Sequence, residues 1–431
     1  DDDQAPGFAP GTAFRTTNAG AAVNDLGQVA FFGFAEVGSP ERGVFFGTDR
    51  SLPAQAGLIA QEGDTVLGGA NGLTLNLSNN TLALDNSGRV VIETRLAGNV
   101  TSATNDALVE DSLSGGPTTI VQRSGDALNP GSSTKIEGLL STSSAPVINN
   151  AGDTAFAAIM SVPDPTPNDP DRRDSGRGYV VDDGTTATIV DGGDPFGPWF
   201  GIGNSYGIDI ADNGNRIYRV DQQAQPRPQI VLNGTVVAKA GDTVVIDGTT
   251  YSLRDLRGPK TNSAGQVLFN AQIEGPDVDT SNDVVLILDG QVILREGDAL
   301  PDGRVWDDRL RSYSLADDGT IVFAVEDGPG NISTAPWGLY YRPAGGTIQS
   351  IFATGDSIEY RPGEVGTVKR LRFLDSGLST SGEWAAFSAS FTLSESTNVA
   401  SRGVFRVSLQ PIPLPAAGWA LLAGLGALAA L

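Results

Sequence analysis

The chain has 431 residues, and its 51 acidic side chains outnumber the 28 basic ones, so that the formal net charge is −23. This charge disfavours nucleic acids and anionic membrane surfaces as partners, because phosphate binding requires clustered Lys and Arg. Neither His nor Cys occurs, which excludes Ser-His-Asp and Cys-His catalysis and the usual zinc sites. Acidic residues spread along the chain are typical of a solvated surface. Adaptation to a saline environment or bound divalent cations are the alternatives.

The sequence starts with Asp1, Asp2, Asp3 and Gln4, without an initiator Met. A mature exported protein whose signal peptide has been removed would begin in this way, as would a fragment with an arbitrary boundary. From here to residue 410, abundant Gly, frequent turn residues and the lack of a sustained 3.6-residue apolar period indicate an all-β protein.

One sequence unit recurs along the chain. Its first element is a polar turn ending in Gly, as in residues 24–27 (Asn-Asp-Leu-Gly), followed by an apolar strand such as Val29-Ala30-Phe31. Asn or Asp followed by Gly supplies the positive φ angles of a tight hairpin turn. The seven turn glycines, about 50 to 64 residues apart, are Gly27, Gly88, Gly152, Gly214, Gly265, Gly319 and Gly382.

Each unit continues with two further apolar strands. In the first unit these are residues 43–46 (Gly-Val-Phe-Phe) and residues 58–60 (Leu-Ile-Ala), and the second of them is followed by Gly63-Asp64. An apolar run before each turn, such as residues 81–84, supplies a fourth strand. Each unit is therefore expected to form a sheet of four antiparallel strands.

Seven such units predict a seven-bladed β-propeller over residues 1–410, in which each blade buries both faces against its neighbours. The alternatives are a linear β-solenoid, whose repeats are much shorter, and a pair of β-sandwiches, which would not explain seven recurrences. The strand alternation places Phe31, Phe156, Phe269 and Phe323 at equivalent buried positions.

The seventh unit differs from the other six because no Gly-Asp strand lies between residues 403–405 and Pro411. Residues 3–7 at the N-terminus resemble the segment that follows Gly-Asp elsewhere, but no apolar strand precedes them. We expect the last blade to have three strands; the alternative is that another segment fills the fourth place.

An aspartate recurs at the end of the third strand in six units. A carboxylate repeated around a ring is more often a turn-capping group that accepts backbone N–H bonds than a catalyst. The alternative is a ring of calcium or ligand contacts around the central channel. These repeat-turn aspartates are Asp64, Asp126, Asp194, Asp242, Asp298 and Asp356.

Two acidic loops are weak calcium candidates, because Ca²⁺ takes six to eight oxygen ligands from flexible segments. The loops contain Asp169, Asp171 and Asp174 in the first case, and Asp277, Asp279 and Asp283 in the second. Neither loop has the Gly and terminal Glu of an EF-hand, and Arg172 and Arg173 oppose a cation in the first. No other cofactor is expected.

Residues 411–431 carry no charge, and 16 apolar residues follow Pro415. This length is below the roughly 20 residues that cross a bilayer. Ala416, Ala420 and Gly424 share one face of the predicted helix, and small residues at this spacing favour helix packing. We expect a Pro-rich linker and an apolar C-terminal helix that contacts a membrane or other apolar helices; a buried core helix is the alternative.

Residues 412–419 resemble the VPLPA-CTERM sorting signal of Gram-negative bacteria. The residues that carry the likeness are Pro413, Leu414, Pro415, Ala416 and Trp419. The resemblance implies export, recognition by an exosortase-type membrane protease and transfer to the cell surface. Ile412 stands where that signal has Val, and no basic cluster follows the apolar run to Leu431. The rest of the chain is similar to exported Asn-x-x-Gly-x-Val-Ala-Phe / Gly-Asp repeat proteins that often carry such segments.

Two functions fit these observations. The sequence favours a non-enzymatic cell-surface or extracellular protein whose propeller is an assembly or binding platform, as a homo-oligomer or surface assembly. The alternative is an extracellular propeller lyase or glycosidase that uses carboxylates around the channel. Paired carboxylates in one pocket would favour the enzyme, whereas a channel lined by Ser, Thr and aliphatic residues would favour the platform.

Overall fold

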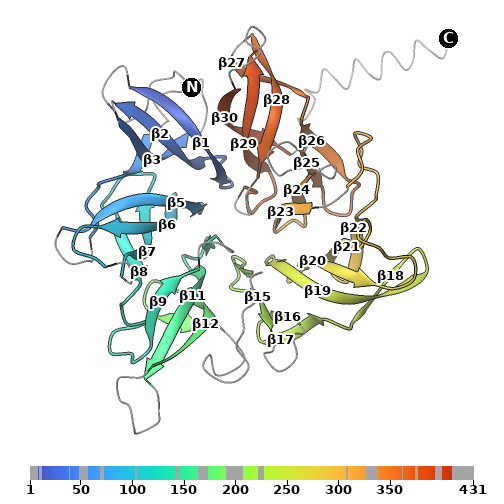
Figure 1. Ribbon diagram of the computed structural model, residues 1–431, viewed down its shortest axis with the longest axis horizontal. Coiled ribbons are helices and arrows are strands. Elements are labelled where there is room, and N and C mark those ends of the chain that lie inside the picture. Colours follow the sequence, from blue (N-terminus) through green and yellow to red (C-terminus); the bar gives the residue numbers. More distant parts are fainter. Residues whose placement is uncertain are drawn as a thin grey trace.

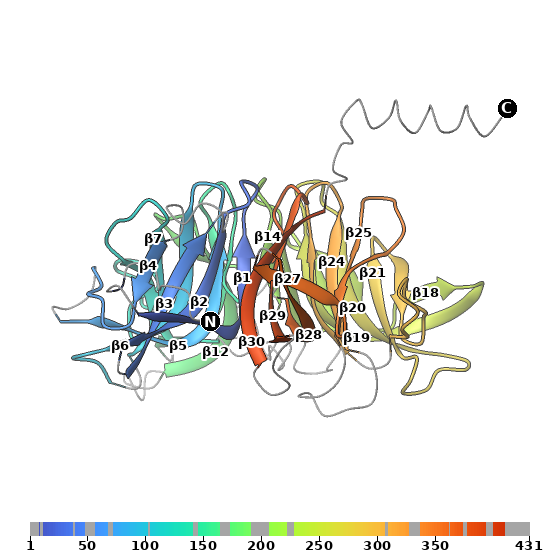
Figure 2. The same cartoon turned by 90° about the horizontal axis from the view of Figure 1, so that it is seen from above.

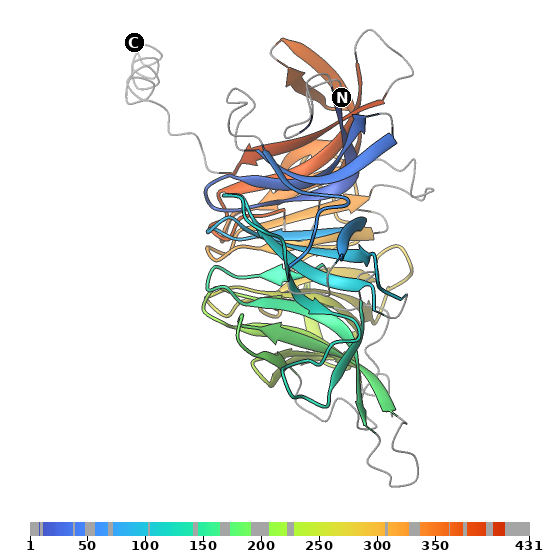
Figure 3. The same ribbon diagram turned by 90° about the vertical axis from the view of Figure 1, so that its left-hand side faces the viewer.

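A computed structural model of the protein contains seven antiparallel β-sheets arranged in chain order around a common centre (Figure 1). The all-β, seven-bladed propeller prediction is confirmed. Seen edge-on, the sheets form a disc (Figure 2), and the third view shows the strands running through its thickness (Figure 3). The structure describes residues 8, 12–37, 39–47, 57–67, 72–101, 104–140, 145–163, 173–190, 207–221, 228–306, 309–326, 337–361, 363–373, 377–393 and 400–409.

The first three blades occupy the N-terminal part of the ring. Blade 1 consists of β1 (Ala13–Val23), β2 (Val29–Val37), β3 (Ser39–Gly47) and β4 (Gly57–Gln61). Blade 2 consists of β5 (Thr74–Leu84), β6 (Arg89–Ala97), β7 (Asp106–Ser112) and β8 (Thr119–Arg123). Blade 3 consists of β9 (Lys135–Leu139), β10 (Val147–Ile148), β11 (Thr154–Pro163), β12 (Arg173–Asp182) and β13 (Ala187–Ile189).

The other four blades complete the ring. Blade 4 consists of β14 (Ile208–Ile210), β15 (Arg216–Asp221), β16 (Pro228–Leu232) and β17 (Thr235–Lys239). Blade 5 consists of β18 (Thr243–Ile246), β19 (Thr249–Thr261), β20 (Val267–Glu274), β21 (Val284–Leu288) and β22 (Gln291–Arg295). Blade 6 consists of β23 (Arg309–Leu315), β24 (Ile321–Glu326), β25 (Trp337–Arg342) and β26 (Gln349–Ala353), and blade 7 consists of β27 (Ser357–Arg361), β28 (Glu364–Arg372), β29 (Trp384–Leu393) and β30 (Ala400–Ser408).

Each seam between neighbouring blades contains its own apolar cluster. Phe156 in blade 3 packs with Val91 and Leu108 of blade 2, and Phe323 in blade 6 packs with Leu268 of blade 5. Both faces of a sheet are therefore buried, because alternate residues of a strand face opposite neighbours. The hydrophobic core is a circle of seven clusters rather than a single centre.

The four phenylalanines predicted to be buried differ in their exposure. Phe156, Phe269 and Phe323 are 4%, 3% and 0% exposed. Phe31 is only half-buried, so the prediction is wrong for this residue. Phe31 faces the seam with blade 7, where the apolar cluster formed by the described residues is small.

The seventh blade contains four strands, so the prediction of three is wrong in number. The additional strand is β27, which forms a hairpin with β28 at the side opposite β30. Strand β18 occupies the same place beside β19 in blade 5. Within the described residues, no strand pairs with the outer edge of β30.

The predicted apolar helix and sorting segment, residues 411–431, lie outside the described residues. In the part of the chain that the structure describes, no helix is long and apolar enough to cross a membrane.

Candidate functional site

A central cavity of about 110 Å³ lies where the inner ends of the blades meet. All seven blades contribute to its wall through residues at or next to the predicted turns. Its aliphatic lining includes Val23, Leu84, Val147, Ile148, Ile210, Leu315 and Leu378. Its polar lining consists of Asp209, Asp212, Lys260, Thr261, Ser314, Asp317, Ser379 and Thr380.

The seven turns beside the cavity have the backbone conformation that their sequence predicts. The turn glycines all have positive φ, from 69° at Gly27 to 104° at Gly152. In the first turn, the Asn24 side chain accepts the Leu26 and Gln28 N–H groups, at 3.2 and 3.0 Å. The Asn or Asp at the start of a turn thus stabilises the turn itself.

Hydrogen bonds also join each turn to the next one and close a complete ring. In each bond an N–H group of one turn donates to a side-chain or carbonyl oxygen of the neighbouring turn. The donor and acceptor pairs, from blade 1 around to blade 1 again, are Asp25 N and Asn86 Oδ1 (2.9 Å), Asn86 N and Asn150 Oδ1 (2.8 Å), Asn150 N and Asp212 Oδ1 (2.7 Å), Asn213 Nδ2 and Ser263 O (2.7 Å), Ser263 N and Asp317 Oδ1 (2.7 Å), Asp317 N and Thr380 O (2.8 Å), and Ser381 N and Asp25 Oδ1 (2.6 Å). We call this set the turn ring.

All three carboxylates in the cavity wall accept hydrogen bonds from neighbouring blades. Asp212 accepts both the N–H and the side-chain amide of Asn150, at 2.7 and 2.6 Å. Asp317 accepts the Ser263 N–H, and Asp209 accepts the Thr261 N–H at 3.0 Å. Bonds of this charge-assisted kind fix the position of a carboxylate. These groups therefore align the blades.

The cavity also contains a basic side chain. Lys260 lies near the end of β19 and is only 6% exposed. The cavity wall thus combines aliphatic groups, hydroxyls, three carboxylates and one ammonium group. Such a surface can bind a small polar molecule through hydrogen bonds.

The five described repeat-turn aspartates lie elsewhere, because none of these five lines the central cavity. Four of them accept the N–H group three residues earlier in the chain, as in the bond from Arg295 N to Asp298 Oδ2 at 2.7 Å. The same bond is made by Asp64, Asp242 and Asp356. Asp126 instead accepts the Arg123 side chain at 2.6 Å, and Asp194 lies outside the described residues.

The two calcium candidates differ in how much of them the structure describes. Asp169 and Asp171 lie outside the described residues, and Asp174 is described only as a backbone position in β12. In the second loop, Asp279 accepts both the N–H and the hydroxyl of Ser281, and these bonds lower the pKa of its carboxyl. Across the described ranges, no group of three or more acidic side chains is placed to hold a metal ion.

The turn ring was not part of the sequence prediction. The sequence pattern accounts for the second residue of each turn, such as Asp25, Asn86 or Asp317, by turn formation alone. A signal was present, because this position is polar in all seven turns. A turn needs Asn or Asp only at particular positions. An additional polar residue at every turn therefore indicates that its side chain forms a hydrogen bond outside its own turn.

Comparisons with solved structures give low similarities. A structure described as Hadza microbial sialidase Hz136 is 10% identical, with a TM-score of 0.35, and the match covers 76% of this chain and 65% of the sialidase. The polysaccharide lyase Uly1 is 12% identical over 82% of this chain and 89% of the lyase, also with a TM-score of 0.35. The chain thus spans about two thirds of the sialidase, and no activity is assigned from these matches. No curated protein sequence matches.

One protein family does match over most of the length, from residue 1 to residue 394. This span includes the turn ring, the central cavity and all blades except the last strand of blade 7. The chain therefore belongs to the family described as a family of unknown function (DUF7453).

Proposed function

We propose that the protein is a non-enzymatic binding or assembly platform that is exported and held at the surface of a Gram-negative cell through residues 411–431. The observation that carries the proposal is the engagement of all three cavity carboxylates with neighbouring blades. A general acid or nucleophile must be available to a substrate, whereas these groups accept bonds that hold the turn ring together.

The remaining chemistry of the chain supports the same proposal. With no His and no Cys, the usual general base and thiol nucleophile are absent. Apart from the carboxylates and Lys260, the side chains of the cavity wall are aliphatic or hydroxyl-bearing, which suits passive binding.

The location is proposed from the sorting-signal resemblance of residues 412–419. Deleting residues 411–431 should leave the propeller folded and should release it from the cells into the medium. Cell fractionation of the native organism, with immunoblotting of envelope and medium fractions, measures this. The thermal midpoint of the truncated protein shows whether it is folded.

A second variant separates recognition from anchoring. Replacing Pro413, Leu414 and Pro415 together by Ala keeps the apolar run but alters the segment that resembles the sorting signal. We expect it to remain in the envelope without transfer to the surface, as measured by protease accessibility of intact cells. Unchanged surface location of both variants would contradict the proposed anchor.

The enzymatic alternative has one specific observation in its favour, namely that three carboxylates and Lys260 share one cavity. A lyase or glycosidase would need one carboxylate free to transfer a proton. The test is polysaccharide turnover by the wild type and by Asp209→Asn and Lys260→Met variants that remain folded. If the wild type turns over a polysaccharide and either folded variant loses this activity, the protein is an enzyme and the platform proposal is wrong.

A further inference from the structure

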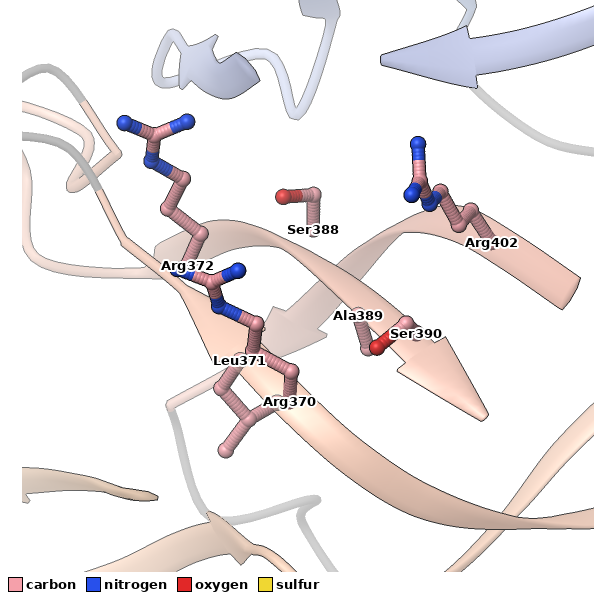
Figure 4. A pocket seen from close by; sticks show the side chains of 7 residues that line it. All are labelled: Arg370, Leu371, Arg372, Ser388, Ala389, Ser390 and Arg402. Atoms are coloured by element: carbon pink, nitrogen blue, oxygen red, sulfur yellow. The ribbon is translucent and has the colours of Figure 1, made fainter. Parts of the chain in front are cut away.

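A small pocket on blade 7 gathers three arginines and two serines on one face of the sheet (Figure 4). Arg370 and Arg372 come from β28, Ser388 and Ser390 from β29, and Arg402 from β30. In the strand register Ser390 lies between Arg370 and Arg402, and Ser388 is opposite Arg372. The pocket shares no lining residue with the central cavity.

An irregularity in β28 places both arginines on the face opposite Val368. The register shifts between Val368 and Arg370, so that Lys369 is an extra residue in the strand. As a result Val368 and Leu371 both pack into the seam with blade 6. Arg370 and Arg372 then project from the opposite face, because a bulge changes the alternation of side chains.

The opposite face is the one turned towards blade 1. Ala386, on the same face of β29, packs with Ala21 and Val23 of β1. Among the described side chains, the apolar contact with blade 1 is at this end of the seam. Arg402 lies farther along β30, and Arg370 and Arg372 lie on β28 opposite Ser390 and Ser388. The sequence of β1 contains no acidic residue that could pair with them.

Arg370 lies close to Arg372 and, like Arg402, has no acidic partner among the described residues. Within the described residues, neither Arg370 nor Arg402 forms an ion pair or a hydrogen bond through its side chain. Desolvation, followed by the positive charge of Arg370, lowers the pKa of Arg372. Like charges held on one face of a sheet are destabilising unless a counter-charge is bound.

The serine hydroxyls also favour the binding of a negatively charged group. Ser388 is 5% exposed, and its hydroxyl has no hydrogen-bond partner among the described residues although it lines the pocket. Figure 4 shows it between the side chains of Arg372 and Arg402. Every charged group in the pocket wall is thus a cation, and both hydroxyls can donate to an acceptor.

We infer that this pocket binds the oxyanion group of a small acidic ligand, a carboxylate, a sulfate or a phosphate. Planar guanidinium groups bind these groups through paired N–H bonds. Adjacent strands are ~4.8 Å apart, so the backbones of Arg370 and Arg402 are ~10 Å apart and their long side chains can converge on one ion. The enclosed space is about 10 Å³, which holds one water-sized atom, so most of the ligand would lie outside it. The net charge of −23 repels polyanions, which favours a ligand with a single charged group.

The test uses the full chain and three probes, sodium sulfate, sodium phosphate and sodium glucuronate, at an ionic strength held constant with NaCl. We expect saturable stabilisation of the wild type by at least one probe in thermal unfolding, because a ligand of the folded state raises its midpoint. Tighter binding of glucuronate indicates a carboxylate ligand, and tighter binding of sulfate or phosphate indicates an ester of that acid. Arg370→Gln and Arg402→Gln should each weaken binding about tenfold or more.

A matched control is Arg254→Gln on blade 5, where an exposed Arg is paired with Glu274 at 3.4 Å. This variant should bind the probes as the wild type does. Without any probe, Arg370→Gln should melt at the same or a higher temperature than the wild type, since it relieves repulsion. The inference fails if no probe stabilises the wild type, if the control loses binding equally, or if Arg370→Gln alone destabilises the free protein.

Discussion

The seam between blades 5 and 6 and the seam between blades 7 and 1 are built differently. The first buries large side chains, among them Trp306, Phe323 and Tyr340, which are fully buried. In the second, the buried apolar residues among those described are small, Ala21 and Ala386 together with Val23 and Val29, and Phe31 remains half-buried. Apolar area therefore holds the first seam more strongly than the second.

Polar contacts are correspondingly more prominent where the ring closes. Arg406 of blade 7 donates to the Gly27 carbonyl of blade 1 and lies 4.4 Å from the ring centre of Trp384. The bond from Ser381 to Asp25 spans 356 residues of sequence. Closing so long a loop is entropically costly, and directional bonds give the correct pairing of the two end blades. Every seam has a bond of the turn ring, but at the closing seam these bonds act beside a smaller described apolar cluster.

The largest expected difference in the free energy of unfolding is between the Phe323→Ala and Phe31→Ala variants. Removing fully buried Phe323 should lower the free energy of unfolding by about 3–5 kcal/mol. Phe31 is half-buried, so its removal should cost about 1–2 kcal/mol. Urea unfolding of both variants measures the difference. Equal losses would show that the closing seam is packed as tightly as the others.

Glu296, which follows β22, is a buried carboxyl in the tightly packed region near Trp306. Burial of its charged form is unfavourable. This carboxyl is 3% exposed and accepts the N–H groups of Asp283 and Val284 at 3.1 and 3.2 Å. Burial raises its pKa from 4.5 to about 7, against the opposing effect of the Val284 bond. A raised carboxyl pKa means that the folded state binds a proton between pH 4.5 and about 7, so stability falls as pH rises through this window.

Glu296→Gln mimics the protonated carboxyl and should be more stable than the wild type at pH 8 by about 3 kcal/mol. The difference between the two proteins should disappear below pH 4.5. Urea unfolding at pH 5 and pH 8 measures both effects. The exposed Glu364→Gln variant is the control, and a stability difference for Glu296→Gln that does not change with pH would contradict the assignment.

The ring of blades followed from the sequence because turn glycines recur where only a positive φ fits, at Gly27 and six equivalent positions. Strands β18 and β27 could not be predicted from the sequence, because neither belongs to the repeated unit. The bonds of the turn ring join residues that are dozens to hundreds of positions apart, and no local pattern specifies such partners. The arginine pocket depends on the bulge at Lys369, which strict alternation would not reveal.

Asp25→Ala tests how far the closing seam depends on the turn ring. The substitution removes the acceptor for Ser381 N and leaves that partly buried donor unsatisfied, which should cost about 1–3 kcal/mol. Asp317→Ala removes the equivalent acceptor for Ser263 N between blades 5 and 6. Hydrogen exchange should accelerate locally at Ser381 in the first variant, and beyond blade 7 and blade 1 if the seam opens. In Asp317→Ala, hydrogen exchange should not accelerate beyond the turn itself, because apolar burial stabilises the seam between blades 5 and 6.

The smallest effects are expected at the repeat-turn aspartates, because the described ones bond within their own turns. Asp298→Asn keeps an oxygen that can accept the Arg295 N–H but removes the charge that strengthens this bond, so the loss should be about 0.5–1 kcal/mol. Asp126→Asn removes only a partly exposed ion pair with Arg123, for which at most about 0.5 kcal/mol is expected. Because the bonds at both positions are local turn contacts, neither variant should change ligand binding or abolish a reaction. Urea unfolding measures the two losses, and a folded Asp298→Asn protein that lost a measured turnover would overturn the structural role of these aspartates and the platform proposal with it.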